Sequence, residues 1–66
     1  MKIDQYKLQN AMMECGKAQY RIAQQAGMDP RTLRRIERDG RCNRNQRDAI
    51  AAAIDIDPHD LMREDM

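Results

Sequence analysis

Aromatic and strand-forming residues are scarce in this 66-residue sequence. It contains no Phe, Trp or Val, a single Thr and only two Tyr. The core must therefore come from Ile, Leu, Met and Ala, which helices accommodate, while the strand formers Val and Thr are almost absent. A chain of this length allows one domain, which buries only about 60% of its unfolded surface. The composition predicts an all-α fold and a single domain over residues 1–66.

Long apolar runs and clustered metal ligands are also missing. No stretch approaches the ~20 apolar residues of a membrane span, and the N-terminal residues MKIDQYKLQNAMMECG carry charges where a secretory signal would be apolar. Two distant Cys and one His offer no ligand pair for a metal and no disulfide scaffold. No nucleophile–base set or phosphate-cradling glycine loop is visible. We expect a cytoplasmic protein that is not an enzyme and uses no cofactor, metal or small-molecule ligand.

The positive charge is concentrated in the middle of the chain. Residues 17–47 hold nine basic and three acidic side chains, a charge of +6, while the remaining residues hold three basic and eight acidic ones, a charge of −5. The sum is the net charge of +1. Because local charge decides which partners approach, this pattern favours a polyanion as the partner of the central region. The alternative is that these residues only solubilise a helix surface.

Apolar spacing predicts two helices in the first half of the chain. A first helix covers roughly residues 4–14 and ends at Gly16. Its apolar stripe consists of Leu8, Ala11, Met12 and Cys15. A second helix ends at Gly27, and its stripe consists of Ala18, Ile22, Ala23 and Ala26.

Capping residues predict three further helices. Asp29-Pro30 begins a short helix over about residues 30–38, which Asp39-Gly40 ends. Asn45 is a plausible cap for a fourth helix, whose buried stripe consists of Ala49, Ile50, Ala53 and Ile54. Asp57-Pro58 begins a last short helix that Leu61 and Met62 would hold. We expect residues 63–66 to fray.

The second and third helices, joined through a Gly-containing turn, are typical of a helix-turn-helix. Leu33 and Ile36 would hold one face of the third helix to the core. Its exposed positions would be Arg31, Thr32, Arg34, Arg35 and Arg38. Arg31 and Arg35 lie one turn apart and project from the same side. This spacing suits a helix entering a major groove, where arginine can form two hydrogen bonds with guanine.

The sequence from Leu8 to Met62 resembles the Cro and phage-repressor (lambda-repressor-like) family, a five-helix DNA-binding fold. The matching residues are Leu8, Gly16, Gln19, Ile22, Ala23, Gly27, Leu33, Ile36, Glu37, Ile50, Ile54, Ile56, Leu61 and Met62. Three positions depart from the family. Met12 stands where an Arg often pairs with the acid matching Glu37, Ala18 where Thr or Ser caps the second helix, and Asp39 where a Gly follows the recognition helix.

The resemblance implies roles for residues at matching positions. Pro30, Arg31, Thr32 and Arg35 are expected to face base edges. Gln19 is expected to contact a phosphate and to support the recognition helix. Thr32 could contact a base or a phosphate. Arg34 and Arg38 lie off the line of Arg31 and Arg35, which favours phosphates or solvent for them. The full set of residues expected to contact phosphates is Lys17, Gln19, Arg34, Arg38, Arg41, Asn43, Arg44 and Asn45. The loop over residues 41–45 and the N-terminus of the fourth helix suit contacts with the DNA backbone, since they offer arginines, amides and free N–H groups.

One helix-turn-helix contacts few bases, which favours a homodimer on a palindromic operator. The dimer contacts implied by the resemblance lie near the C-terminus, with Ile54, Ile56, Pro58 and Met62 as candidates. We therefore expect a transcriptional regulator that binds double-stranded DNA, most simply a repressor. Two alternatives stay open: a protein-interaction module, such as an antirepressor or antitoxin-like subunit, and a nonspecific architectural binder. Cys42 is either a redox-sensitive thiol or an ordinary loop residue.

Overall fold

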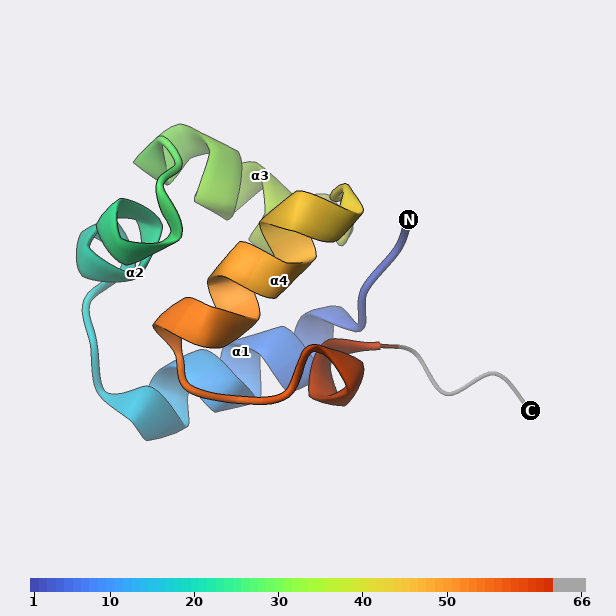
Figure 1. The fold of residues 1–66 in the computed structure, drawn as a ribbon, viewed down its shortest axis with the longest axis horizontal. Coiled ribbons are helices and arrows are strands. Elements are labelled where there is room, and N and C mark those ends of the chain that lie inside the picture. Colours follow the sequence, from blue (N-terminus) through green and yellow to red (C-terminus); the bar gives the residue numbers. More distant parts are fainter. Residues whose placement is uncertain (63–66) are drawn as a thin grey trace.

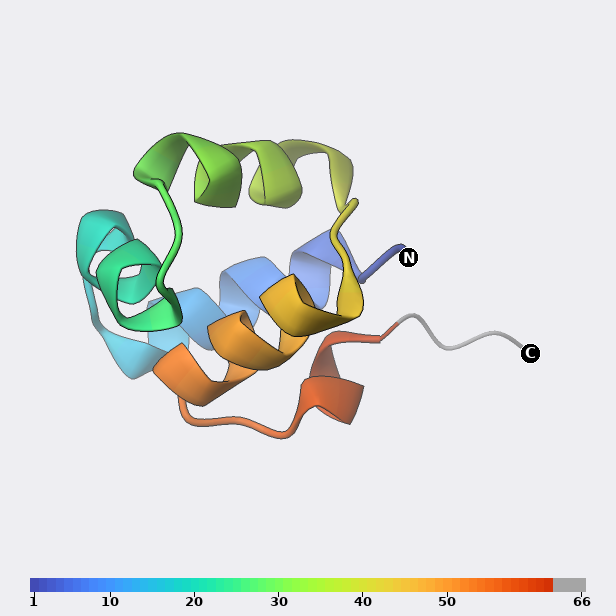
Figure 2. The same ribbon diagram turned by 45° about the horizontal axis from the view of Figure 1, so that its top comes forward.

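The computed structural model describes residues 1–62, in which four α-helices are followed by one 3-10 turn and no strand is formed (Figures 1 and 2). The elements are α1 (Gln5–Cys15), α2 (Gln19–Ala26), α3 (Pro30–Asp39), α4 (Arg44–Ala53) and η1 (Pro58–Leu61). The expected all-α fold is confirmed. The fifth predicted helix is instead the single 3-10 turn η1. The fraying predicted for residues 63–66 lies outside the described residues.

The helices enclose a small aliphatic core. α2 packs against both α3 and α4, and α1 packs against α3 and η1. The fully buried large side chains are Leu8, Ile22, Leu33, Ile36, Ile50 and Leu61. All six are apolar positions that the sequence had singled out, and they confirm that Ile and Leu build the core. Within residues 1–62, no helix combines the length and apolar character that crossing a membrane requires.

Local capping fixes where α1 and α3 begin and where α3 ends. The Asp4 carboxylate accepts hydrogen bonds from the backbone N–H groups of Tyr6 and Lys7, and Asp29 caps α3 in the same way through Arg31 N. Of the two predicted terminators of α3, Gly40 is the one with left-handed backbone, at φ 72°. A Cβ at Gly40 would also lie 2.9 Å from the Ile3 carbonyl oxygen. Asp39 remains the last helical residue.

The predicted start of α4 is wrong by about one half-turn. Asn43, not Asn45, is the N-cap, and its side chain accepts a hydrogen bond from Gln46 N at 2.7 Å. The Gln46 side chain in turn accepts from Asn43 N at 3.0 Å. This reciprocal capping box satisfies two N–H groups that the helix itself leaves unpaired, and only a residue three positions before Gln46 can form it.

The first residues of the chain lie alongside the loop that follows α3. Met1 N donates to the Cys42 carbonyl at 2.9 Å, Cys42 N donates back to the Met1 carbonyl at 3.1 Å, and Ile3 N donates to the Gly40 carbonyl at 2.8 Å. We call Met1–Ile3 the N-terminal arm. The arm buries Ile3 and covers Cys42, two core residues that no apolar stripe predicted.

Candidate nucleic-acid interface

The arginines of α3 share one side of the helix. At about 100° per residue, Arg34, Arg38, Arg31 and Arg35 follow one another within an arc of about 100°. Leu33 and Ile36 project in the opposite direction, and both are fully buried. All four arginines are exposed. The core contact of two aliphatic side chains therefore turns a continuous cationic stripe toward solvent.

Three of these guanidinium groups have no carboxylate partner in the described chain. Arg31, Arg34 and Arg38 make no side-chain hydrogen bond or ion pair with any of residues 1–62. Exposed cations that are not neutralised within the chain remain available to an external anion. Pro30, at the first helical position, is exposed beside them, whereas Thr32 is half-buried on the flank of the helix.

Arg35 differs from the other three. Its Nη1 lies 3.7 Å from Asp39 Oδ2, one turn later on α3, and 3.4 Å from the carbonyl oxygen of Arg41. The side chains of Arg35 and Asp39 are 43% and 37% exposed, so the pair contributes at most about 0.5 kcal/mol. The guanidinium predicted to face a base edge therefore points toward the loop after α3, held only weakly.

Gln19 connects α2 with α3. Its side-chain Nε2 donates a hydrogen bond to Glu37 Oε2. Glu37 thus has a hydrogen-bond partner, although residue 12 is a buried Met and offers it no charge. The supporting role predicted for Gln19 is consistent with this contact, whereas its phosphate contact stays a prediction. Ala18 makes no side-chain cap to α2, as its methyl group requires.

The loop after α3 and the first turn of α4 extend the polar surface. Arg41, Asn43, Arg44 and Asn45 are all exposed. The side chains of Arg41 and Arg44 have no partner among residues 1–62. Asn43 uses its oxygen to cap α4, which leaves its NH2 group to donate elsewhere. Asn43 and Asn45 line an open pocket with Gly27 and Met28 of the α2–α3 turn. The phosphate contacts predicted for the four residues stay predictions.

Lys17 is engaged elsewhere in the fold. Its Nζ donates to the Ala53 carbonyl at 2.9 Å and to Gln25 Oε1 at 2.9 Å. A lysine at the last carbonyls of a helix satisfies an unpaired acceptor and complements the helix dipole. Lys17 therefore closes the C-terminal end of α4, and we leave it out of the proposed interface. Sequence spacing could not show this contact, because the two residues are 36 positions apart.

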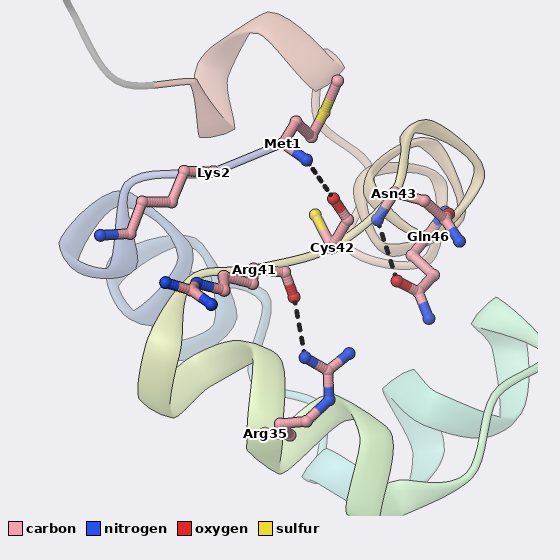
Figure 3. Close-up of a pocket in the computed structure, with 7 residues that line it drawn as sticks. All are labelled: Met1, Lys2, Arg35, Arg41, Cys42, Asn43 and Gln46. Atoms are coloured by element: carbon pink, nitrogen blue, oxygen red, sulfur yellow. Dashed lines mark hydrogen bonds between the residues drawn. The ribbon is translucent and has the colours of Figure 1, made fainter.

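An open groove lies between the N-terminal arm, α3 and the start of α4 (Figure 3). Its lining residues are Met1, Lys2, Arg35, Arg41, Cys42, Asn43 and Gln46. No acidic side chain is among them. Lys2 and Gln46 were not predicted as site residues, since neither belongs to a motif in the sequence. Lys2 lies opposite Arg41 because the arm pairs with the loop, and Gln46 is held at the groove by its capping box with Asn43.

The four candidate dimer residues differ in accessibility. Ile54 is only 3% exposed and belongs to the core of its own chain, so it cannot also line a dimer contact in this conformation. Ile56, Pro58 and Met62 are half-buried. Their remaining exposed surface lies along the segment that follows α4, and the dimer contact stays a prediction for these three residues.

Neither cysteine is an exposed thiol in the interface. Cys42 is 7% exposed, and burial raises the pKa of its thiol above the ordinary value of 9.0 against the opposing effect of nearby Arg47 and Arg35. Cys15 is half-buried on α1 and donates to the Met12 carbonyl. Across residues 1–62, no group of three His, Cys, Asp or Glu side chains is placed to hold a metal ion.

Comparison with protein-family models, with curated proteins and with solved structures gave no significant match.

Proposed function

We propose that this protein is a lambda-repressor-like, sequence-specific DNA-binding regulator of transcription, with α2 and α3 as its helix-turn-helix. The observation that carries the proposal is the stripe of Arg31, Arg34 and Arg38. These guanidinium groups are exposed on one side of α3 and are unpaired within residues 1–62. A row of exposed arginines on α3, the second helix of the helix-turn-helix, suits the major groove of DNA, which admits an α-helix.

The polar surface around α3 supports the same proposal. Arg41 follows the C-terminal end of α3, and Asn45 lines an open pocket with Gly27 and Met28 of the turn before α3. Arg41, Arg44 and Asn45 are exposed and suit phosphates of the DNA backbone. Phosphate contacts fix the position of the protein, and base contacts supply the preference for a sequence. In this arrangement Arg31, with Pro30 and Thr32 beside it, meets base edges, while Arg34 and Arg38 meet the backbone.

The proposed assembly on DNA is a homodimer. A single α3 spans only a few base pairs, so two subunits on a palindromic site give the specificity that one lacks. Ile56, Pro58 and Met62 supply the candidate contact, because they retain exposed apolar surface outside the arginine stripe. Repression by occupying an operator needs only the DNA-binding surface around α3 and this dimer contact.

Selection from a pool of random duplexes tests the proposal. We expect enrichment of a palindrome whose half-sites are about one helical turn apart, about 10 base pairs. A variant in which Arg31, Arg34 and Arg38 are all Gln should enrich nothing. Equal binding of random and enriched duplexes would identify a nonspecific architectural binder. Failure to bind any duplex would refute the proposal and favour a protein-interaction module.

A further inference from the structure

We propose that the groove beside α3 binds one phosphate of the DNA backbone through Lys2, Arg35 and Arg41. The inference rests on the proposed function and goes beyond it in two respects. It adds Lys2, from the N-terminal arm, to the interface. It also directs Arg35 to a phosphate, whereas the sequence assigned this residue to a base edge.

The backbone holds Lys2 and Arg41 opposite each other. They form an antiparallel bridge. On one side of it, Met1 and Cys42 exchange two backbone hydrogen bonds, and on the other side Ile3 N donates to the Gly40 carbonyl. Opposed residues at such a non-hydrogen-bonded position bring their side chains closer together than at a hydrogen-bonded one. Like charges held this way repel each other. Neither side chain has a partner among residues 1–62, so an external anion would relieve the repulsion.

Arg35 approaches the same groove from α3. Figure 3 shows its guanidinium turned from the helix toward the carbonyl of Arg41, and the distance to that oxygen is 3.4 Å. Asp39, one turn later on α3, is the one acid that pairs with it among residues 1–62. An exposed ion pair of this kind exchanges easily for a stronger partner. A phosphate offers that partner, because a guanidinium can donate two parallel hydrogen bonds to it.

Two amide groups add further donors. The oxygens of Asn43 and Gln46 are both used in the capping box of α4. Their NH2 groups therefore remain as donors on the lining of the groove, and neither has an acceptor within residues 1–62. Among residues 1–62, the groove thus presents ammonium, guanidinium and amide donors and no acidic lining residue, which suits a phosphate oxygen.

Binding measurements on the duplex enriched by selection test the inference. Lys2→Gln removes one charge from the groove, and Arg21→Gln removes one from an exposed site on α2 outside it. Because each subunit of the dimer loses one phosphate contact, we expect Lys2→Gln to lower the salt slope of the binding constant by about two. The wild-type advantage over this variant should then shrink about 12-fold between about 50 and 200 mM salt. Arg21→Gln should leave the slope almost unchanged.

Arg35→Lys separates phosphate binding from base recognition. If Arg35 holds a phosphate, Lys at this position retains most of the affinity and all of the base preference. If Arg35 binds a guanine through two hydrogen bonds, the same change weakens the preference at one base pair by about 10-fold or more. The second outcome overturns the inference and leaves the proposed function intact.

A scan of duplexes with single neutral methylphosphonates locates the phosphate. At one position in each half-site, the substitution should weaken the wild type more than it weakens Lys2→Gln or a variant with Arg41→Gln, because each variant has lost one of the three cations that hold this phosphate. The same profile for all three proteins overturns the inference. Failure of the wild type to bind any duplex instead refutes the proposed function. Thermal unfolding of each variant confirms that these exposed substitutions leave the fold intact.

Discussion

Gln19, at the start of α2, donates a hydrogen bond from its side-chain amide to the carboxylate of Glu37 on α3. This bond ties the arginine-bearing helix to the helix before it at the end far from their connecting turn. Because the turn fixes only one end of the pair, the Gln19–Glu37 bond helps to set the angle at which α3 is presented.

Gln19→Ala should therefore lower both stability and DNA affinity. A lost hydrogen bond of this kind costs about 1 kcal/mol of unfolding free energy, which urea unfolding measures. Gln24→Ala is the control, because the Gln24 side chain is also exposed on α2 but makes no hydrogen bond within residues 1–62. It should change stability by less than about 0.5 kcal/mol. Equal stabilities for the two variants would show that the bond does not hold α3.

Gly40→Ala should destabilise the protein more than Gly16→Ala. Both glycines have left-handed backbone, at φ 72° and 69°, which costs an L-residue about 1–2 kcal/mol. A Cβ at Gly16 meets nothing within 4 Å, whereas one at Gly40 lies 2.9 Å from the Ile3 carbonyl oxygen. The difference in urea midpoint between the variants isolates this contact with the N-terminal arm. If Gly16→Ala lowers the unfolding free energy as much as Gly40→Ala does, close contact with the N-terminal arm does not limit the residue at position 40.

Arg31→Ala and Arg44→Ala should weaken DNA binding in different ways. Arg31 projects from the first turn of α3, and its loss should cost about 1–3 kcal/mol and relax the preference at one base pair. Loss of Arg44, at the first turn of α4, should weaken binding to all sequences alike and lower the salt slope of the dimer by about two. Binding to a panel of single-base variants of the operator checks both. Identical effects on the panel would remove Arg31 from base recognition.

The Cys42 thiol should make the fold sensitive to high pH. Burial raises the pKa of this thiol above 9.0, so the native state holds the proton more tightly than the unfolded chain. The protonated Cys42 thiol therefore contributes its full share of the unfolding free energy below pH 9, and this contribution is lost as the pH rises through the pKa of the native thiol. Unfolding from pH 7 to 11 should show a fall in stability that Cys42→Ala abolishes and Cys15→Ala retains. At neutral pH, iodoacetamide should modify half-buried Cys15 faster than Cys42.

Local chemistry determined the helices and the stripe of arginines before any packing was known. Asp29-Pro30 marks the start of α3 and Gly27 marks the end of α2, by capping rules that involve only neighbouring residues. The structure confirms both boundaries. The 3.6-residue period also placed Leu33 and Ile36 in the core and the arginines opposite to them. A periodic helix that buries one face must expose the other.

Only the tertiary structure decided which cations stay available for a partner. Lys17 closes the end of α4 through a residue 36 positions away, and Arg35 turns toward the carbonyl of Arg41. Lys2 faces Arg41 because the N-terminal arm pairs with a loop some 40 residues later in the chain. Such contacts follow from how the helices meet, since hydrogen bonds between distant segments leave no periodic pattern in the sequence.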